Sequence, residues 1–196
     1  MDRRAEILGN IRRQVVDGPE LPESPGPWIQ YADPWQQFRD VLASVGGQAH
    51  LVRDHAELEQ KVLGLPACAA ARLRSSQLPL AGDWNVRLDE LDDPHRLAPL
   101  DFAVLQGEFA VAENAAIWVT DRGVRHRAVY FIVQHLAIVV PTAEVVHNMH
   151  EAYARLALGA AGFGCFLSGP SKTADIEQSL VIGAHGARSL NVFIVG

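Results

Sequence analysis

Three segments place apolar residues at helical spacing and so predict helices. The first covers about residues 2–16, where isoleucine, leucine and valine recur every three or four positions. The second covers residues 34–45, where an Asp-Pro pair supplies an N-cap and a first helical residue, and Gly-Gly ends the apolar stripe. The third covers residues 54–63, which begin with Asp and Glu at the spacing of a capping box.

Shorter apolar segments bounded by glycine or polar residues predict strands. They are residues 49–52, 102–105, 109–111, 117–119, 163–167 and 190–195. Residues 129–140 are apolar almost throughout and predict one long strand or a bent pair of strands. Residues 66–100 carry no pattern that separates helix from strand, so their structure stays open.

Two further helices are predicted in the C-terminal third of the chain. Thr142 can cap a helix that continues to about Gly159. Thr173 can cap a shorter helix after the turn at Gly169-Pro170. A buried strand, a glycine turn, a helix and the final strand would then form a right-handed crossover unit.

This order of helices and strands predicts an α/β fold with a mixed or mostly parallel sheet flanked by helices. The chain has 196 residues, of which 48% are hydrophobic, so we expect one domain over residues 1–196. The N-terminal helix and a connection with four prolines occupy about residues 1–33. We expect this connection to be extended and to lie over a neighbouring subunit, which would make the protein a homo-oligomer.

The distribution of charged and apolar residues limits the classes of partner that we expect. The formal net charge is −6, and no block of lysine and arginine occurs, so we expect no nucleic-acid partner. The N-terminus lacks the apolar core of a signal peptide, and the longest apolar run, residues 129–141, is shorter than the roughly 20 residues of a membrane helix. These observations favour a cytoplasmic protein without a membrane span.

The positions of the two cysteines indicate whether this chain can bind a metal or an iron–sulfur cluster. Cys68 and Cys165 each lack a second cysteine or histidine at the spacing of a metal or cluster site. We therefore expect no metal, iron–sulfur cluster or other cofactor in this chain, and both cysteines are interpreted as small buried hydrophobic residues.

Residues 168–178 are the richest segment for chemistry, because they join a predicted strand to a predicted helix start. Unpaired N–H groups there would attract an anion, and Ser171, Lys172 and Thr173 would add two hydroxyls and a cation. The alternative is structural: the hydroxyls cap the helix while Asp175 and Glu177 complement its dipole. The segment lacks the glycines of a phosphate-binding P-loop and of a nucleophile elbow, which disfavours both functions.

Other candidates are more isolated. Glu144, His147, His150 and Glu151 have spacings that can bind a metal, but on the predicted helix Glu144, His147 and Glu151 occupy the solvated face. The pair Glu113-Asn114 either directs a carboxylate into a cleft or forms a polar turn. His185 lies among glycines and could join a ligand site.

The run Gly169-Pro-Ser-Lys-Thr-Ala-Asp-Ile-Glu-Gln178, with Leu180-Val-Ile-Gly-Ala-His-Gly186 and the final strand, resembles the C-terminal signature of the lactate-utilization (LUD) family. It is most similar to the short, cluster-free members of the lactate utilization protein C type. The resemblance implies a fold akin to ribose-phosphate isomerases, sugar-phosphate deaminases and coenzyme A transferases. Family members often carry an acidic residue followed by Thr-Gly near mid-chain; here Glu113 is followed by Asn114-Ala115.

The resemblance also implies a function. It suggests an accessory subunit that helps partner proteins with iron–sulfur clusters to oxidise L-lactate to pyruvate. The candidate ligand-binding residues, for a small anionic metabolite, are Gly169, Ser171, Lys172, Thr173 and His185. The candidate catalytic residues are Glu113, Asp175 and Glu177. The alternatives are a stand-alone enzyme on a sugar phosphate or acyl-coenzyme A, with Glu113 or Asp175 as base or nucleophile, and a non-catalytic interaction module.

Overall fold

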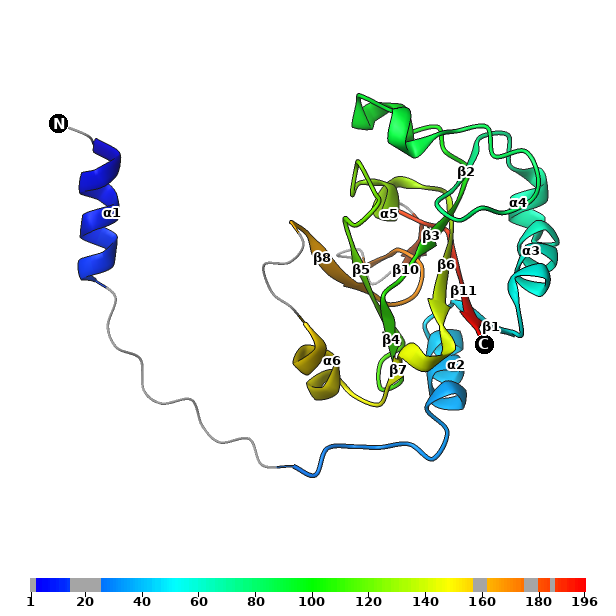
Figure 1. Ribbon diagram of the computed structural model, residues 1–196, viewed down its shortest axis with the longest axis horizontal. Helices are drawn as coiled ribbons and strands as arrows, with labels where there is room; N and C mark the ends of the chain where they lie inside the picture. Colours follow the sequence, from blue (N-terminus) through cyan, green and yellow to red (C-terminus); the bar gives the residue numbers. More distant parts are fainter. Residues whose placement is uncertain (1–2, 15–25, 157–161, 175–179, 184–185) are drawn as a thin grey trace.

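Five strands form a parallel sheet in the order β1-β11-β6-β3-β2 (Figure 1). The computed structural model describes residues 3–14, 26–156, 162–174, 180–183 and 186–196. The five strands are β1 (Gln48–Val52), β2 (Arg74–Ser76), β3 (Phe102–Gln106), β6 (His135–Pro141) and β11 (Ser189–Val195). The α/β fold with a parallel sheet is therefore confirmed, as are the strands predicted at 49–52, 102–105 and 190–195.

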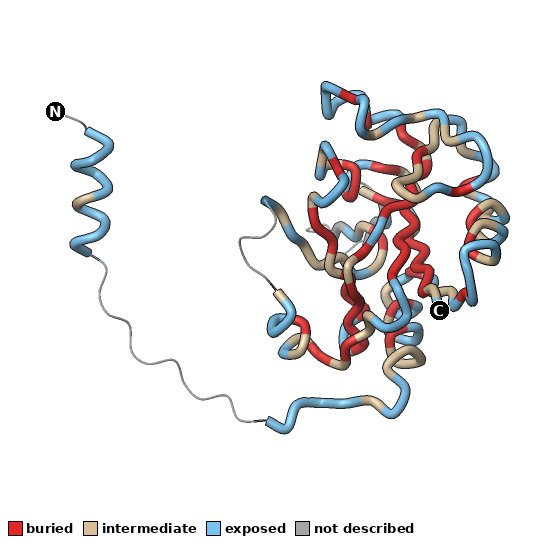
Figure 2. Tube along the Cα trace, in the orientation of Figure 1, coloured by how far each residue is buried: buried red, intermediate tan, exposed pale blue. Residues whose placement is uncertain are grey.

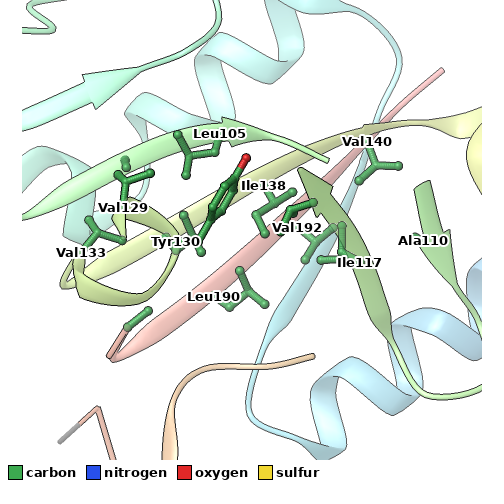
Figure 3. Close-up of a cluster of buried hydrophobic side chains, with 14 of the residues drawn as sticks. Leu105, Ala110, Ile117, Val129, Tyr130, Val133, Ile138, Val140, Leu190 and Val192 are labelled. Carbon is green, nitrogen blue, oxygen red and sulfur yellow. The ribbon is translucent and has the colours of Figure 1, made fainter. Parts of the chain in front are cut away.

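The two faces of this sheet bury different side chains, because successive residues of a strand point to opposite sides. One face packs against α3 (His55–Leu63) and α4 (Pro66–Ala70) through a core that includes Phe102, Val104, Ala137, Val139 and Phe193. The other face packs against α2 (Pro34–Ser44) and a second sheet. Figure 3 shows part of this larger core, in which Leu105, Ile138, Leu190 and Val192 lie together.

The second sheet is mixed and has the order β7-β4-β5-β8. Its strands are β4 (Phe109–Val111), β5 (Ala116–Thr120), β7 (Val145–Val146) and β8 (Gly164–Leu167). Ala110 and Ile117 belong to the core shared with the parallel sheet, whereas Phe109 and Trp118 pack on the opposite side, near α6 (Met149–Arg155). Figure 2 shows that the buried residues concentrate in these two layers of strands.

Gly107 lies where the chain leaves the parallel sheet for the mixed one. A methyl group on this residue would come within 3.0 Å of side-chain carbons of Ile117, Ile138 and Val140. The absence of a side chain at Gly107 thus lets the two sheets approach closely.

The predicted N-terminal helices are confirmed. α1 (Arg3–Arg13) buries none of its residues and lies apart from the two sheets in Figure 1. In α2 the Asp33 carboxylate accepts a hydrogen bond from the backbone N–H of Gln36, and in α3 Asp54 accepts one from Glu57. Residues 66–100, left open by the sequence, form α4, β2 and short 3-10 turns at Leu88–Glu90 and Pro94–Leu97.

Two predictions in the middle of the chain are wrong. Residues 129–140 are not continuous strand: Val129–Ile132 form one helical turn, α5, before β6 begins at His135. A run that is apolar on every side has no period that could separate these forms. The helix predicted from Thr142 begins only at Met149, because Asn148 caps it and Val145–Val146 pair with β4 instead.

The predicted crossover unit is also wrong. β8 pairs antiparallel with β5 in the mixed sheet and does not pair with β11. Thr173 does not begin a helix: it belongs to β9 (Lys172–Ala174), which pairs antiparallel with β10 (Leu180–Ile182), and residues 175–179 of the expected helix lie outside the described residues. β8 is an edge strand and contains no fully buried residue.

The described part of the proline-rich connection contacts this chain itself. The backbone N–H of Tyr31 donates to Nδ1 of His147 at 3.0 Å, and the rings of Trp28 and His150 stack with centroids 3.4 Å apart. Residues 26–33 are thus held against the segment that leads into α6. None of the helices that the structure describes is long and apolar enough to cross a membrane.

Candidate functional site

A cavity of about 320 Å³ lies where the loop after β8 meets the starts of β6 and β11. Ser168–Lys172 form one wall of this cavity, and Tyr130 and Phe131 of α5 form another. Leu136, Gly186, Ala187 and Leu190 contribute from the parallel sheet and the residues before β11. We call it the serine–lysine pocket.

Backbone conformation and hydrogen bonds fix the loop that forms this pocket. Gly169 has φ +76°, a left-handed conformation that favours glycine, and a Cβ there would lie 2.9 Å from Cγ2 of Val45. The Ser168 hydroxyl donates to the carbonyl oxygen of Asn114 at 2.7 Å. The Ser171 N–H donates to the carbonyl oxygen of Ala187 at 2.8 Å, so the loop is tied to the segment before β11.

The polar groups of the pocket suit an anion. Lys172 is exposed and is the only charged side chain among the described residues that line the pocket. Beside it, the half-buried Ser171 hydroxyl makes no hydrogen bond to a described residue. The Tyr130 hydroxyl donates to the carbonyl oxygen of Thr120 at 3.0 Å, and burial raises its pKa to about 12, so it stays neutral. An ammonium group and a hydroxyl are therefore available to a carboxylate or phosphate.

Anion binding in this pocket would not depend on the helix N-terminus that the sequence predicted. Lys172 and Thr173 belong to β9, and the nearby backbone groups are in use: the Gly183 N–H donates to the carbonyl oxygen of Ser171 at 2.9 Å. A binding site here depends on side chains, because the row of unpaired N–H groups of a helix end is missing from these residues.

The structure brings Gly169, Ser171 and Lys172 together in the pocket. Thr173 continues into β9, but its side chain lies outside what the structure describes, as do Asp175, Glu177 and His185. Their proposed roles stay predictions. Sequence reasoning missed the remaining walls, formed by α5 and the residues before β11, because no local pattern connects those segments to the loop.

Glu113 lies in the turn between β4 and β5, beside the start of α6, and does not line the pocket. Its carboxylate accepts a hydrogen bond from the backbone N–H of Met149 at 2.9 Å, and its own N–H donates to the carbonyl oxygen of His147. The following Ala115 is buried and has φ +53°, at the place where the resembled family often has glycine. This geometry favours the polar-turn interpretation of Glu113-Asn114; a catalytic role for Glu113 stays a prediction.

The histidine and glutamate candidates near α6 are engaged elsewhere. Glu144 forms an ion pair with Arg155, with 2.6 Å between Oε2 and Nη1, and the Glu151 carboxylate accepts from the backbone N–H of His147. Within the described ranges, no three histidine, cysteine, aspartate or glutamate side chains are grouped so as to hold a metal ion.

This chain matches a known family and is similar to proteins of two bacteria. Residues 86–195 match the family described as the LUD domain. The chain is 26% identical over 234 residues to a protein of Geobacillus thermodenitrificans named lactate utilization protein C, covering 100% of this chain and 97% of that one. A protein of the same name from Deinococcus radiodurans is 30% identical over 213 residues, covering 100% and 96%.

A solved structure supports the fold. The crystal structure of a DUF162 family protein from Deinococcus radiodurans superimposes with a TM-score of 0.62, covering 86% of this chain and 99% of that one. The two sequences are 23% identical, so this likeness concerns the fold alone.

Proposed function

Because this chain belongs to the LUD domain family, we propose that it is an accessory subunit of an iron–sulfur-containing system that oxidises L-lactate to pyruvate, and that it binds a small anionic metabolite in the serine–lysine pocket. Relatives that align with the whole chain are named lactate utilization protein C, which supports a role in lactate utilization. The observation that carries the binding proposal is Lys172, the one cationic side chain among the described residues that line a pocket large enough for a small organic acid, where it lies beside the Ser171 hydroxyl.

The positions of the cysteines support placing the clusters in partner proteins. Cys68 is buried in α4 against the parallel sheet, whereas Cys165 belongs to β8 in the mixed sheet. Burial raises the pKa of both thiols, which disfavours the thiolate form that binds iron. We expect the purified protein to be colourless and its cluster-bearing partners to co-purify from lactate-grown cells.

The test of the pocket uses the fact that the chain has only two lysines, Lys61 and Lys172. Lys172→Met removes the charge and keeps most of the side chain. We expect the affinity for L-lactate or pyruvate, measured by calorimetry, to fall about 10- to 150-fold, since one charge-assisted contact is lost. The melting temperature should change little, because Lys172 is exposed.

Lys61→Met is the matched control. Lys61 forms an ion pair with Glu57 in α3, with 3.2 Å between Nζ and Oε1, and does not line the pocket. This variant should bind the acids like the unmodified protein. Equal affinity in the Lys172 variant, or an equal loss in both variants, would overturn the binding proposal. Failure of a strain with Lys172→Met to grow on lactate would support its link to lactate use.

A further inference from the structure

A second cavity, of about 460 Å³, opens at the edge of the parallel sheet where β3, β6 and β11 begin. Its charged and titratable side chains come from Arg72, Asp101, His135 and Arg188. Each of these residues lies shortly before or at the first residue of a strand, so the sheet fixes the positions of their backbones. We call this cavity the arginine pocket.

Neither guanidinium group forms a direct ion pair within the described part of the chain, although the positive charge of Arg72 lies close enough to Asp101 to help lower the pKa of that carboxyl. Neither Arg72 nor Arg188 forms an ion pair or a side-chain hydrogen bond with a described residue. Buried or half-buried arginines normally find such partners, but these two are exposed and face an open cavity. Both are therefore available to an anionic ligand.

Asp101 is the carboxylate of this pocket, and its hydrogen bonds serve the backbone. Its Oδ2 accepts from the N–H groups of Leu73 and Arg72, each at 2.9 Å. These hydrogen bonds lower the pKa of Asp101, and the bond from Leu73 has the largest effect. The carboxylate is therefore ionised and fixes the backbone of the two residues that precede β2. With two arginines and one aspartate the pocket keeps a net positive charge.

His135 supplies a third polar group. Its Nδ1 is 2.8 Å from the hydroxyl oxygen of Ser189, while Nε2 makes no hydrogen bond to a described residue. Burial, together with the nearby charge of Arg188, lowers the pKa of His135, so the ring is neutral at pH 7. A neutral imidazole beside two guanidiniums can bond to an oxyanion without adding a further charge.

Gln134 adds another polar residue to the lining, and the rest of the wall is small and apolar. Ala67, Ala70 and Ala71 contribute from α4 and its C-cap, and Ala98-Pro99 contribute from the turn before β3. This composition leaves space beside the arginines and offers a surface for the organic part of a ligand. Pockets of this volume accommodate small metabolites.

We propose that the arginine pocket binds the phosphate group of a small phosphate monoester, with Arg72 and Arg188 holding the phosphate and the alanines contacting its organic part. Guanidinium groups bind phosphate oxygens in pairs, and a phosphate monoester carries about −1.5 to −2 charges at pH 7. A single carboxylate would leave one guanidinium without a partner. The site goes beyond the proposed lactate-related function and does not depend on it.

The arginine pocket and the serine–lysine pocket share a wall. Gly186 and Ala187 line the serine–lysine pocket, and the next residue, Arg188, lines the arginine pocket. In β6, His135 lines one pocket and Leu136 the other. A test must therefore separate the two sites by variants that change only one of them.

The experiment is a calorimetric titration of the full chain with phenyl phosphate at low ionic strength. Arg72→Gln and Arg188→Gln should each weaken binding about 10-fold or more, because each removes a charge-assisted contact. Inorganic phosphate should bind more weakly than phenyl phosphate, since it cannot contact the alanines. Benzoate, which has the ring but a single charge, should bind at least 10-fold more weakly than phenyl phosphate.

Two variants serve as controls. Arg39→Gln removes an exposed arginine of α2 that does not line the pocket, and Lys172→Met changes only the serine–lysine pocket. Both should bind phenyl phosphate like the unmodified protein. Unchanged affinity in the Arg72 and Arg188 variants, an equal loss in the Arg39 variant, or a loss confined to the Lys172 variant would each overturn the proposal. The last result would place the phosphate in the serine–lysine pocket.

Discussion

The two sheets of this protein differ in how completely their faces are covered. The parallel sheet is packed on both sides, by α3 and α4 on one face and by α2 and the mixed sheet on the other. Among the described residues, the outer face of the mixed sheet packs against the short α6, where Tyr153 remains 62% exposed, and its edge strand β8 has no fully buried residue. The serine–lysine pocket lies at their boundary, so a well-packed sheet positions one wall and a sparsely packed edge supplies the polar loop.

The largest expected effect tests this difference in packing directly. Phe193→Ala in β11 should lower the free energy of unfolding by about 3–5 kcal/mol, because Phe193 is fully buried and the sheet cannot collapse around the cavity. Phe166→Ala in β8, which is only half-buried, should cost about 2 kcal/mol. Urea denaturation of both variants measures the contrast. Equal losses would mean that the mixed sheet is packed as tightly as the parallel one.

A second substitution tests how closely the sheets approach each other. Gly107→Ala should lower the free energy of unfolding by about 3 kcal/mol, because its methyl group would press on β5 and β6 at once. Gly9→Ala in α1 is the control: apart from its own helix, no described atom lies within 4 Å of the added methyl group, so the unfolding of the two sheets should not change. A tolerated Gly107→Ala would show that the mixed sheet can shift relative to the parallel one.

The smallest of the three effects concerns the hydrogen bond between Tyr130 of α5 and Thr120 of the mixed sheet. Burial raises the pKa of Tyr130 to about 12 in the folded protein, from an ordinary value of 10.0. Stability from the neutral phenol is therefore complete below pH 10 and is lost as the pH rises through 12, by about 2 kcal/mol in all. Thermal unfolding between pH 9 and pH 12 measures this loss.

Tyr130→Phe should reduce the loss of stability at high pH, since it removes the titrating group and keeps the ring. The control Tyr153→Phe, at an exposed position, should leave the profile unchanged. An alkaline loss that persists in the Tyr130 variant would assign it to other groups.

Most of the parallel sheet and its helices could be predicted from local signals. α2 and α3 begin at aspartates whose carboxylates do cap the first turn, and β3 and β11 are short apolar runs with clear ends. Such signals act within a few residues, so one sequence is enough to identify them.

The segment after β6 could not be predicted, because long-range pairing decides it. Thr142 and Asn148 are both reasonable helix caps, and only the pairing of Val145–Val146 with β4 selects Asn148. Likewise, the pairing of β9 with β10 places Thr173 in a strand and not at the start of a helix. Of the candidate site, the contiguous Ser171 and Lys172 were found, since they are neighbours in sequence.

The segment just before β11 separates two cavities, since Ala187 lines one of them and Arg188 lines the other. A molecule that displaces this segment on binding changes the work needed to fill the opposite cavity. Thermodynamic reciprocity then requires the second molecule to alter the affinity of the first by the same factor. If both proposed sites are used, two consecutive residues would thus make the response of the chain to one metabolite depend on the concentration of another.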